Sequence, residues 1–208
     1  MKTEIIVIGA GAHAKVCVEL LRAMGEQVAY CVGKSDSPNS CVGVPVLTGD
    51  EHLATLRSEG YSRLFVAIAL NSLRAQLAES GIEHGYELTN AVSPTAVISP
   101  SVKLGRGIAV MPNAVINAEA KIDDLAIINT GATIDHDCHI GRAVHIAPQC
   151  ALAGNVTVGE YSFLGVGAKA IPDIRIGKHA TIGAGGVVIR HINDGVTAVG
   201  VPARVLAK

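Results

Sequence analysis

The densest group of polar side chains in the second half of the sequence is the segment from Asn129 to Cys138, which reads NTGATIDHDC. It places His136 directly before Asp137. An imidazole titrates near neutrality and can remove a proton from an attacking amine. A neighbouring carboxylate favours the imidazolium and so makes the imidazole more basic. We interpret His136 as a candidate general base assisted by Asp137; a solvated histidine in a surface turn is the alternative.

Two further histidines, His139 and His145, follow His136 closely enough to suggest a metal site. Zinc sites need His and Cys ligands that converge on one point. Strand geometry alternates side chains between opposite faces, so these imidazoles should point in different directions, and we expect no metal. His13, in a glycine-rich turn, is a better candidate for contact with a sugar or phosphate.

The segment that carries His136 belongs to a repeat of six residues, which extends from about residue 96 to 190. The position two residues before each aliphatic residue is never charged and never larger than Ile. Gly, Asn or Asp often follows the aliphatic residue directly, as at Gly105, Asn117, Asp123, Gly141, Gly159, Gly177 and Gly183. The aliphatic series is Ile98, Leu104, Val110, Ile116, Ile122, Ile128, Ile134, Ile140, Ile146, Leu152, Val158, Leu164, Ala170, Ile176, Ile182 and Val188.

A sustained period of six is typical of a parallel β-helix. Two inward residues spaced two apart share one face of a short strand, and turn residues follow where the backbone bends. Three such units close a triangular coil of eighteen residues. Coils stack at about 4.8 Å, which predicts a prism of about five coils, roughly 25 Å long. An amphipathic helix would need a period of 3.6 residues instead.

The coil length predicts which residues stack on one another. Gly154 follows His136 by one coil, so it should lie against the imidazole and leave space for a substrate. Val166 and Ala184 are also one coil apart, and each lies between two glycines. His145 follows His136 by half a coil. One chain should therefore separate the two imidazoles, which could still meet if they come from adjacent subunits.

Residues 1–90 show a different pattern, in which apolar strands alternate with helical segments. We expect a parallel sheet with strands at 4–8, 27–32, 44–47 and 64–68 and helices at 12–24, 50–59 and 72–80. The turn after the first strand reads Gly9-Ala10-Gly11-Ala12-His13, and the N–H groups of such a turn can bind a phosphate or a sugar. A tight strand–helix turn without a ligand is the alternative.

The composition excludes several classes of protein. The net charge of −1 argues against nucleic acid as a partner. The sequence has no apolar run long enough for a membrane span, and its start does not resemble a signal peptide. The odd number of cysteines without CxxC spacing indicates reduced thiols and predicts a cytoplasmic location.

The six-residue pattern, the ending Gly200-Val201-Pro202-Ala203 and the glycine turn together resemble the PglD-like and NeuD-like sugar acyltransferases, over essentially the whole chain. The resemblance implies a small Rossmann-like α/β domain at residues 1–90 that binds a nucleotide-linked sugar. It also implies a left-handed parallel β-helix at residues 91–208 that uses acetyl-CoA, and a homotrimer with active sites between subunits.

The resemblance further implies roles for single residues. His136 matches the catalytic base, and Asp137 matches the acid that makes it more basic. The cofactor positions are His145, whose backbone N–H is a candidate oxyanion donor, with Gly154, Val166 and Ala184. The substrate positions are Gly11, Ala12, His13, Lys34, Asp36, Asn71 and Arg74.

Two of the substrate segments depart from the pattern of the family. Gly33-Lys34 stands where an Asp-Asp pair is usual, and Ala69-Leu70-Asn71 lacks a glycine. The identity of the nucleotide base is therefore open.

These features favour an N-acetyltransferase that acts on a nucleotide-activated amino sugar, for which we expect a UDP-4-amino-4,6-dideoxyhexose. Direct transfer is expected because no Cys or Ser lies in an activating setting. An O-acetyltransferase of sialic acid type would use the same base. A non-catalytic scaffold that binds sugar nucleotides is an alternative from another class. An NAD(P) oxidoreductase is more distant, since no acidic residue ends the second strand.

Overall fold

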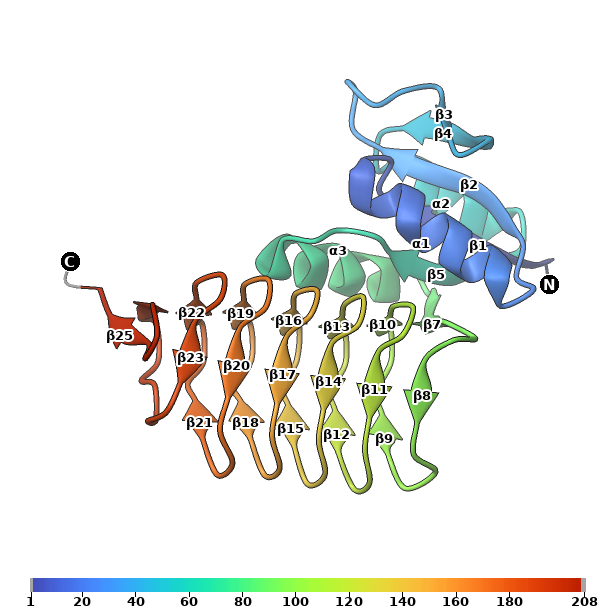
Figure 1. Ribbon diagram of the computed structural model, residues 1–208. Coiled ribbons are helices and arrows are strands. Elements are labelled where there is room, and N and C mark those ends of the chain that lie inside the picture. The colour runs from blue at the N-terminus through green and yellow to red at the C-terminus, as the bar shows by residue number, and fades with distance from the viewer. Residues whose placement is uncertain (1, 207–208) are drawn as a thin grey trace. The chain divides into compact units, whose positions relative to one another are not determined.

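A computed structural model describes residues 2–206. The chain divides into two compact units, Met1–Pro94 and Thr95–Lys208 (Figure 1). The sequence had placed this boundary after residue 90. Within the described residues, no helix is both long and apolar enough to cross a membrane.

The first unit is a small α/β domain around a sheet with the strand order β3-β4-β2-β1-β5-β6. The central strand β1 (Lys2–Ile8) pairs in parallel with β2 (Val28–Gly33) and β5 (Tyr61–Val66). The other elements are α1 (Ala12–Ala23), β3 (Ser40–Cys41), β4 (Val44–Thr48), α2 (His52–Ser58), α3 (Asn71–Glu83), β6 (Glu87–Leu88) and β7 (Ala91–Val92). The predicted alternation of strands and helices is confirmed, whereas the two-residue strands β3, β6 and β7 were not foreseen.

The first strand determines the position of the glycine turn that follows it. Residues 5–8 are buried without alternation, as expected for a parallel strand that is covered on both faces. The chain then turns at Gly9, whose φ of 120° suits glycine, and a Cβ there would lie 2.8 Å from the carbonyl oxygen of Ala67. This close approach fixes the glycine turn at the carboxyl end of β1.

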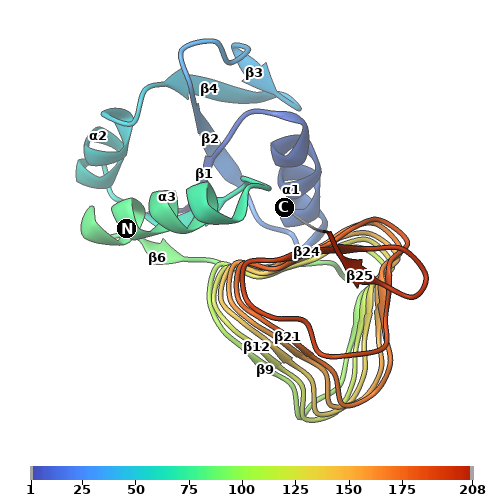
Figure 2. The same cartoon turned by 90° about the vertical axis from the view of Figure 1, so that its left-hand side faces the viewer.

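The second unit is a left-handed parallel β-helix with three faces, which Figure 2 shows nearly end-on as a stack of triangular coils. The faces are built from two-residue strands. The first face is a sheet that begins with β7 and continues with β10 (Ala109–Val110), β13 (Ile127–Ile128), β16 (His145–Ile146), β19 (Phe163–Leu164), β22 (Thr181–Ile182) and β24 (Thr197–Val199), with β25 (Arg204–Val205) antiparallel to β24. The second contains β8 (Val97–Ile98), β11 (Val115–Ile116), β14 (Thr133–Ile134), β17 (Ala151–Leu152), β20 (Lys169–Ala170) and β23 (Val187–Val188). The third contains β9 (Lys103–Leu104), β12 (Lys121–Ile122), β15 (His139–Ile140), β18 (Thr157–Val158) and β21 (Arg175–Ile176).

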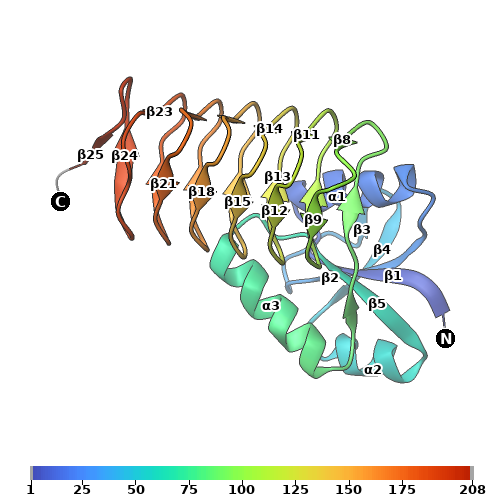
Figure 3. The ribbon, with the colours of Figure 1, turned by 90° about the horizontal axis from the view of Figure 1, so that it is seen from below.

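The register of the coils follows the predicted repeat. On the second face Ile116 pairs with Ile134, and Ile134 with Leu152, so equivalent residues lie one coil apart (Figure 3). All the predicted inward aliphatic residues are buried, except Ile98 and Leu104 in the first coil, which are half-buried. The apolar interior of the prism is therefore one continuous column of stacked aliphatic side chains.

The glycines that follow the aliphatic residues have a different role from the one expected. Positive φ occurs instead at the third residue after every aliphatic residue of the series except the first and the last, for example at Asp137 (61°) and Asn155 (58°). Gly141 and Gly159 are required by close stacking: a Cβ at Gly159 would lie 2.5 Å from the backbone nitrogen of Lys178, and one at Gly141 would lie 2.7 Å from that of Glu160. The turn is thus made by a left-handed residue, and these glycines let the next coil approach.

The inward column provides a test of the packing. Ile140 is fully buried, so Ile140→Ala should lower the free energy of unfolding by about 2–5 kcal/mol through lost burial and a cavity. Lys121→Ala, at an exposed position of the same face, should change it by less than about 0.5 kcal/mol. Urea unfolding at one fixed protein concentration measures both. Similar values for the two variants would contradict the packing.

Candidate active site

His136 and Asp137 form a pair at the corner between the second and third faces. The Nδ1 atom of His136 lies 2.8 Å from Oδ2 of Asp137, and more than half of each side chain is exposed. The hydrogen bond to Asp137 is the main cause that raises the pKa of His136, and the negative charge of Asp135 adds to it. With Nδ1–H donated to the carboxylate, the lone pair of neutral His136 lies on Nε2, which is the nitrogen able to accept a proton.

Two further residues, Asp135 and Asn117, also belong to this corner, although the sequence did not indicate either as a site residue. The Oδ1 atom of Asp135 accepts the backbone N–H of His136 at 2.8 Å and an N–H of the Asn117 amide at 3.0 Å. These hydrogen bonds, the backbone one first, hold the pKa of Asp135 below its usual range. The pair could have been found from the sequence, because Asn117 and Asp135 are separated by one coil.

Gly154 lies against the imidazole, as the coil length predicted. A Cβ on Gly154 would come within 2.5 Å of Cε1 and 2.6 Å of Nε2 of His136. The backbone of the corner is held by the ladder between coils, since Asn155 donates to the carbonyl of His136 at 2.9 Å. The missing side chain therefore makes room for the imidazole ring itself.

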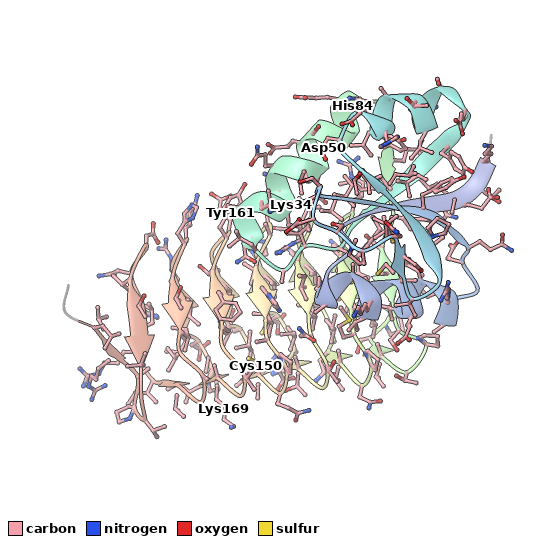
Figure 4. All side chains as sticks on the ribbon, turned by 90° about the horizontal axis from the view of Figure 1, so that it is seen from above. Lys34, Asp50, His84, Cys150, Tyr161 and Lys169 are labelled. Atoms are coloured by element: carbon pink, nitrogen blue, oxygen red, sulfur yellow. The ribbon has the colours of Figure 1, made fainter. Side chains whose placement is uncertain are left out.

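A shallow groove of about 450 Å³ runs across the second face beside this corner. Asp135 lines it from the corner, and Lys169 contributes a cation from β20. In Figure 4 the side chain of Lys169 points away from the prism, whereas Cys150 belongs to the buried interior. The rest of the lining is mainly apolar, formed by Ala151, Leu152, Ala153, Ala170, Ile171, Pro172 and Val187, with Thr133.

His145 lies on the first face, which does not include the corner of His136. Its Nε2 atom is 3.1 Å from Nδ2 of Asn129, and its ring meets the edge of Phe163 with centroids 5.3 Å apart. The backbone N–H of His145 donates to the carbonyl of Ser162 at 3.0 Å. The expected oxyanion role of this N–H is therefore wrong, because the ladder between coils already uses it.

Val166 and Ala184 occupy equivalent corner positions on successive coils, where β20 and β23 begin shortly afterwards. Both are exposed, and the carbonyl of Val166 accepts the N–H of Gly185 at 2.8 Å. Among the backbone hydrogen bonds of the described residues, none uses the N–H of Val166 or Ala184. Stacked N–H groups at exposed corners can donate to the amide carbonyls of an extended ligand.

The three histidines considered for a metal have separate partners. Nε2 of His139 pairs with Asp123 at 2.8 Å, while His136 and His145 bind Asp137 and Asn129. Within residues 2–206, no group of three or more His, Cys, Asp or Glu side chains is arranged to hold a metal ion.

The N-terminal unit contains a pocket of about 500 Å³ at the carboxyl ends of β1 and β2. Of the predicted substrate residues, it brings together Gly11, Lys34 and Asp36. It also includes Asp50, which the sequence analysis did not single out; Lys34 and Asp50, labelled in Figure 4, come from different loops. Its wall is completed by Ile8, Gly9, Ala10, Val32, Gly33, Ser37, Pro38, Ile68, Leu73, Gln76 and Leu77.

Gly11 is glycine without a local structural reason. Its φ is −86°, which any residue adopts, and a Cβ there would meet nothing within 4 Å. It is the N-cap of α1, whose first N–H groups have no side-chain cap. Such N–H groups favour an anion, and a glycine lets it approach closely. The absence of a side chain at residue 11 thus suits a ligand better than it suits the fold.

The other predicted substrate residues do not line this pocket. Burial is the main cause that lowers the pKa of His13 to about 4, and its Nε2 atom lies 3.5 Å from Sγ of Cys17. The guanidinium of buried Arg74 donates to the carbonyls of Ile68 and Ala69, both at 3.0 Å, and to Oδ1 of Asn71 at 2.9 Å. Arg74 and Asn71 therefore hold the loop between β5 and α3. Ala12, the first residue of α1, is also outside the lining.

The cysteines do not provide a nucleophile. All five are free and buried. Burial raises the pKa of Cys17 and Cys31 to about 12 and that of Cys150 to about 11. The thiolate is the reactive form of cysteine, so these thiols are inert and an acyl-cysteine intermediate is disfavoured.

A left-handed β-helix with an exposed histidine–carboxylate pair at one corner is the arrangement of hexapeptide acetyltransferases. Known proteins agree with this class. Residues 4–80 match the PglD N-terminal domain family. PerB from Caulobacter crescentus, solved in complex with CoA and GDP-perosamine, is 53% identical with a TM-score of 0.95, over 98% of this chain and 97% of that chain.

Two further relatives extend the comparison. The acetyltransferase domain of PglB from Neisseria gonorrhoeae FA1090, solved with acetyl coenzyme A, is 38% identical with a TM-score of 0.92, over 99% of this chain and 100% of that chain. The GDP-perosamine N-acetyltransferase of Escherichia coli O157:H7 is 27% identical over 95% of this chain and 94% of its own length. The chain belongs to the PglD/NeuD-like sugar acyltransferase family, and its predicted class, an acetyltransferase, is confirmed.

The contact between Gly154 and His136 predicts the effect of one methyl group. Gly154→Ala should displace the imidazole from its place beside Asp137 and lower kcat by about 10- to 100-fold, because a small misplacement of a catalytic group is costly. The melting temperature should change little, since the backbone at residue 154 is not in the left-handed region. Steady-state kinetics and a thermal melt measure the two effects. Normal kcat in a folded Gly154→Ala variant would contradict the proposed geometry.

Proposed function

We propose that this protein transfers the acetyl group of acetyl-CoA to the amine of a nucleotide-linked amino sugar, with His136 as the general base. The single observation that carries the proposal is the geometry at the corner: Nδ1 of the exposed imidazole is bound to Asp137, which leaves Nε2 to accept a proton, and the ring lies in the place that a side chain at Gly154 would fill. Relatives solved with CoA and a nucleotide-linked amino sugar, or with acetyl coenzyme A, support the choice of substrates.

The chemistry follows from the protonation state of His136. Nε2 takes a proton from the sugar amine while the amine nitrogen forms a bond to the thioester carbon. The carbon–sulfur bond then breaks, and the imidazolium returns the proton to the departing CoA thiolate. The products are an acetamido sugar and free CoA, and Asp137 stabilises the imidazolium between the two steps. The inert cysteines are consistent with this direct transfer.

The two substrates, a nucleotide-linked sugar and acetyl-CoA, need different parts of the chain. The N-terminal pocket offers the uncapped start of α1 and Lys34 to a diphosphate or base, and Asp36 and Asp50 to hydroxyl or N–H donors. On the β-helix, the groove of the second face and the N–H groups of Val166 and Ala184 suit the apolar stretches and amides of acetyl-CoA. We assign nucleotide binding to the first unit and acetyl-CoA binding to the second.

For the nucleotide we favour GDP over the UDP expected from the sequence. The relative at 53% identity is solved with GDP-perosamine, and a second relative is named for it. Lys34, which replaces an acidic residue of the usual pattern, lines the pocket. A lysine ammonium is a suitable donor to O6 and N7 of guanine. UDP- and dTDP-linked sugars remain the alternatives for the test below.

His136→Ala separates an enzyme from a binding scaffold. We expect the purified variant to lose at least about 100-fold in kcat, since a general base contributes about that much or more. It should keep its thermal stabilisation by the sugar nucleotide, whose pocket lies elsewhere. The assay is CoA release with GDP-, UDP- and dTDP-linked amino sugars and with sialic acid. Turnover of sialic acid alone would support O-acetylation, and unchanged turnover in His136→Ala would remove the histidine from the mechanism.

We further propose a homotrimer with active sites between subunits. His136 and His145 lie on different parts of the prism, half a coil apart in sequence, so both can serve one site only if neighbouring chains supply them. His136→Ala and His145→Ala should each be nearly inactive alone. After the two are mixed, unfolded and refolded together, activity should return to a fraction of wild type. No recovery in a confirmed mixed oligomer would contradict a shared site.

A further inference from the structure

Asp135 is a second carboxylate next to His136: it precedes the histidine in the chain, as Asp137 follows it. It directly follows strand β14, and its Oδ1 atom accepts two N–H groups at once, from the backbone of His136 at 2.8 Å and from Asn117 at 3.0 Å. Asn117 belongs to the preceding coil. The carboxylate therefore joins the backbone of the base to a neighbouring coil through one oxygen atom.

The turn itself does not require a charge at this position. At another corner, Oδ1 of Asn129 accepts the N–H of Thr130 at 2.8 Å, which is the same bond made by a neutral amide. The equivalent position in the coil after Asp135 is Ala153, so the stacking of coils requires no polar group here either. The fold alone therefore does not explain why residue 135 carries a negative charge.

We propose that Asp135 is a positioning residue for acetyl transfer: with Asn117 it fixes the backbone of His136, and its charge stabilises the imidazolium together with Asp137. This inference rests on the proposed function of His136 as the base. Asp137 holds the ring through Nδ1, whereas Asp135 holds the main chain through N–H, so the two carboxylates restrict different parts of the residue. The direction of the His136 pKa agrees, since both acids raise it.

Few other charges face the imidazole from the neighbouring coils. The column of His136 itself contains Ala118, Gly154 and Pro172, which are uncharged. The column of Asp137 contains Glu119 and Asp173, and Asp173 is bound to Asn155 at 2.7 Å. Lys169 lines the same groove as Asp135 from a later coil. Asp135 and Asp137 are thus the two charged residues in the same turn as His136.

Two substitutions separate the charge of Asp135 from its hydrogen bonds. Asp135→Asn keeps an Oδ1 acceptor for both N–H groups but removes the charge. Asp135→Ala removes both. Asp173→Asn is the matched control, because it neutralises another corner aspartate that pairs with an asparagine but does not contact His136.

Activity requires neutral His136, so the rate rises with pH through the pKa of this group. In Asp135→Asn the pKa of His136 should fall, and the rise in kcat/KM should move to lower pH. We expect kcat to fall by about threefold to tenfold, with KM for both substrates nearly unchanged. In Asp135→Ala, kcat should fall by at least about another tenfold, because the backbone of the base loses its acceptor. Asp173→Asn should match the wild type in both readouts.

Titration of the His136 imidazole by NMR gives a readout that does not depend on turnover. A lower pKa of His136 in Asp135→Asn supports the proposal whether or not any sugar in the panel is acetylated. The absence of acetylation for every sugar would contradict the proposed function instead. An unchanged pKa and pH profile in Asp135→Asn overturns the electrostatic role. Equal kcat in Asp135→Ala and Asp135→Asn overturns the positioning role.

Discussion

The backbone ladder between coils is the constraint on which the rest of the β-helix depends. Neighbouring coils exchange backbone hydrogen bonds in both directions: the N–H of Asp135 donates to Leu152 in the next coil at 3.0 Å, and the N–H of Asn155 donates back to His136 in the preceding coil at 2.9 Å. The ladder therefore aligns each side chain with the side chains at the same position in the coil before it and in the coil after it. A site built on such columns is held by the main chain rather than by flexible loops. Most backbone N–H groups of the strands are bound in this ladder. The N–H of His145 is one of them, so it is not available to stabilise an oxyanion.

The corners are the positions where the ladder leaves backbone and side chains available. A left-handed residue makes the turn, and the residue before it points its side chain outward, as His136 does before Asp137. Where coils must approach closely, as at Gly141 and Gly159, only glycine fits. Gly154 differs from these, because the group it makes room for is the side chain of the base and not the backbone of a coil. One residue type thus has two separate roles in the same prism.

Much of this architecture is readable from the sequence because its inward columns consist of Ile, Leu and Val at a fixed spacing. The same spacing identified Gly154 correctly. It would also have linked Asn117 to Asp135, had it been applied to polar residues. The burial of Arg74 could not be read in this way, since an arginine next to a loop looks the same whether it binds a ligand or the carbonyls of Ile68 and Ala69. The short strands β3 and β6 lack a pattern because two residues are too few to show one.

The exposure of His136 and Asp137 has a consequence for how strong a base the imidazole can be. The side chains of His136 and Asp137 are 59% and 60% exposed in the single chain. An ion pair this open to water is weak, because the solvent screens its charges. The same charges would interact more strongly in an environment from which water is excluded, as when a substrate covers the corner. The hydrogen bonds of Asp135 and Asn117 do not depend on the exclusion of water, because they already hold the main chain of His136 in the single chain. The fold therefore sets the position of the base in each chain, whereas its full basicity depends on the groups that cover it.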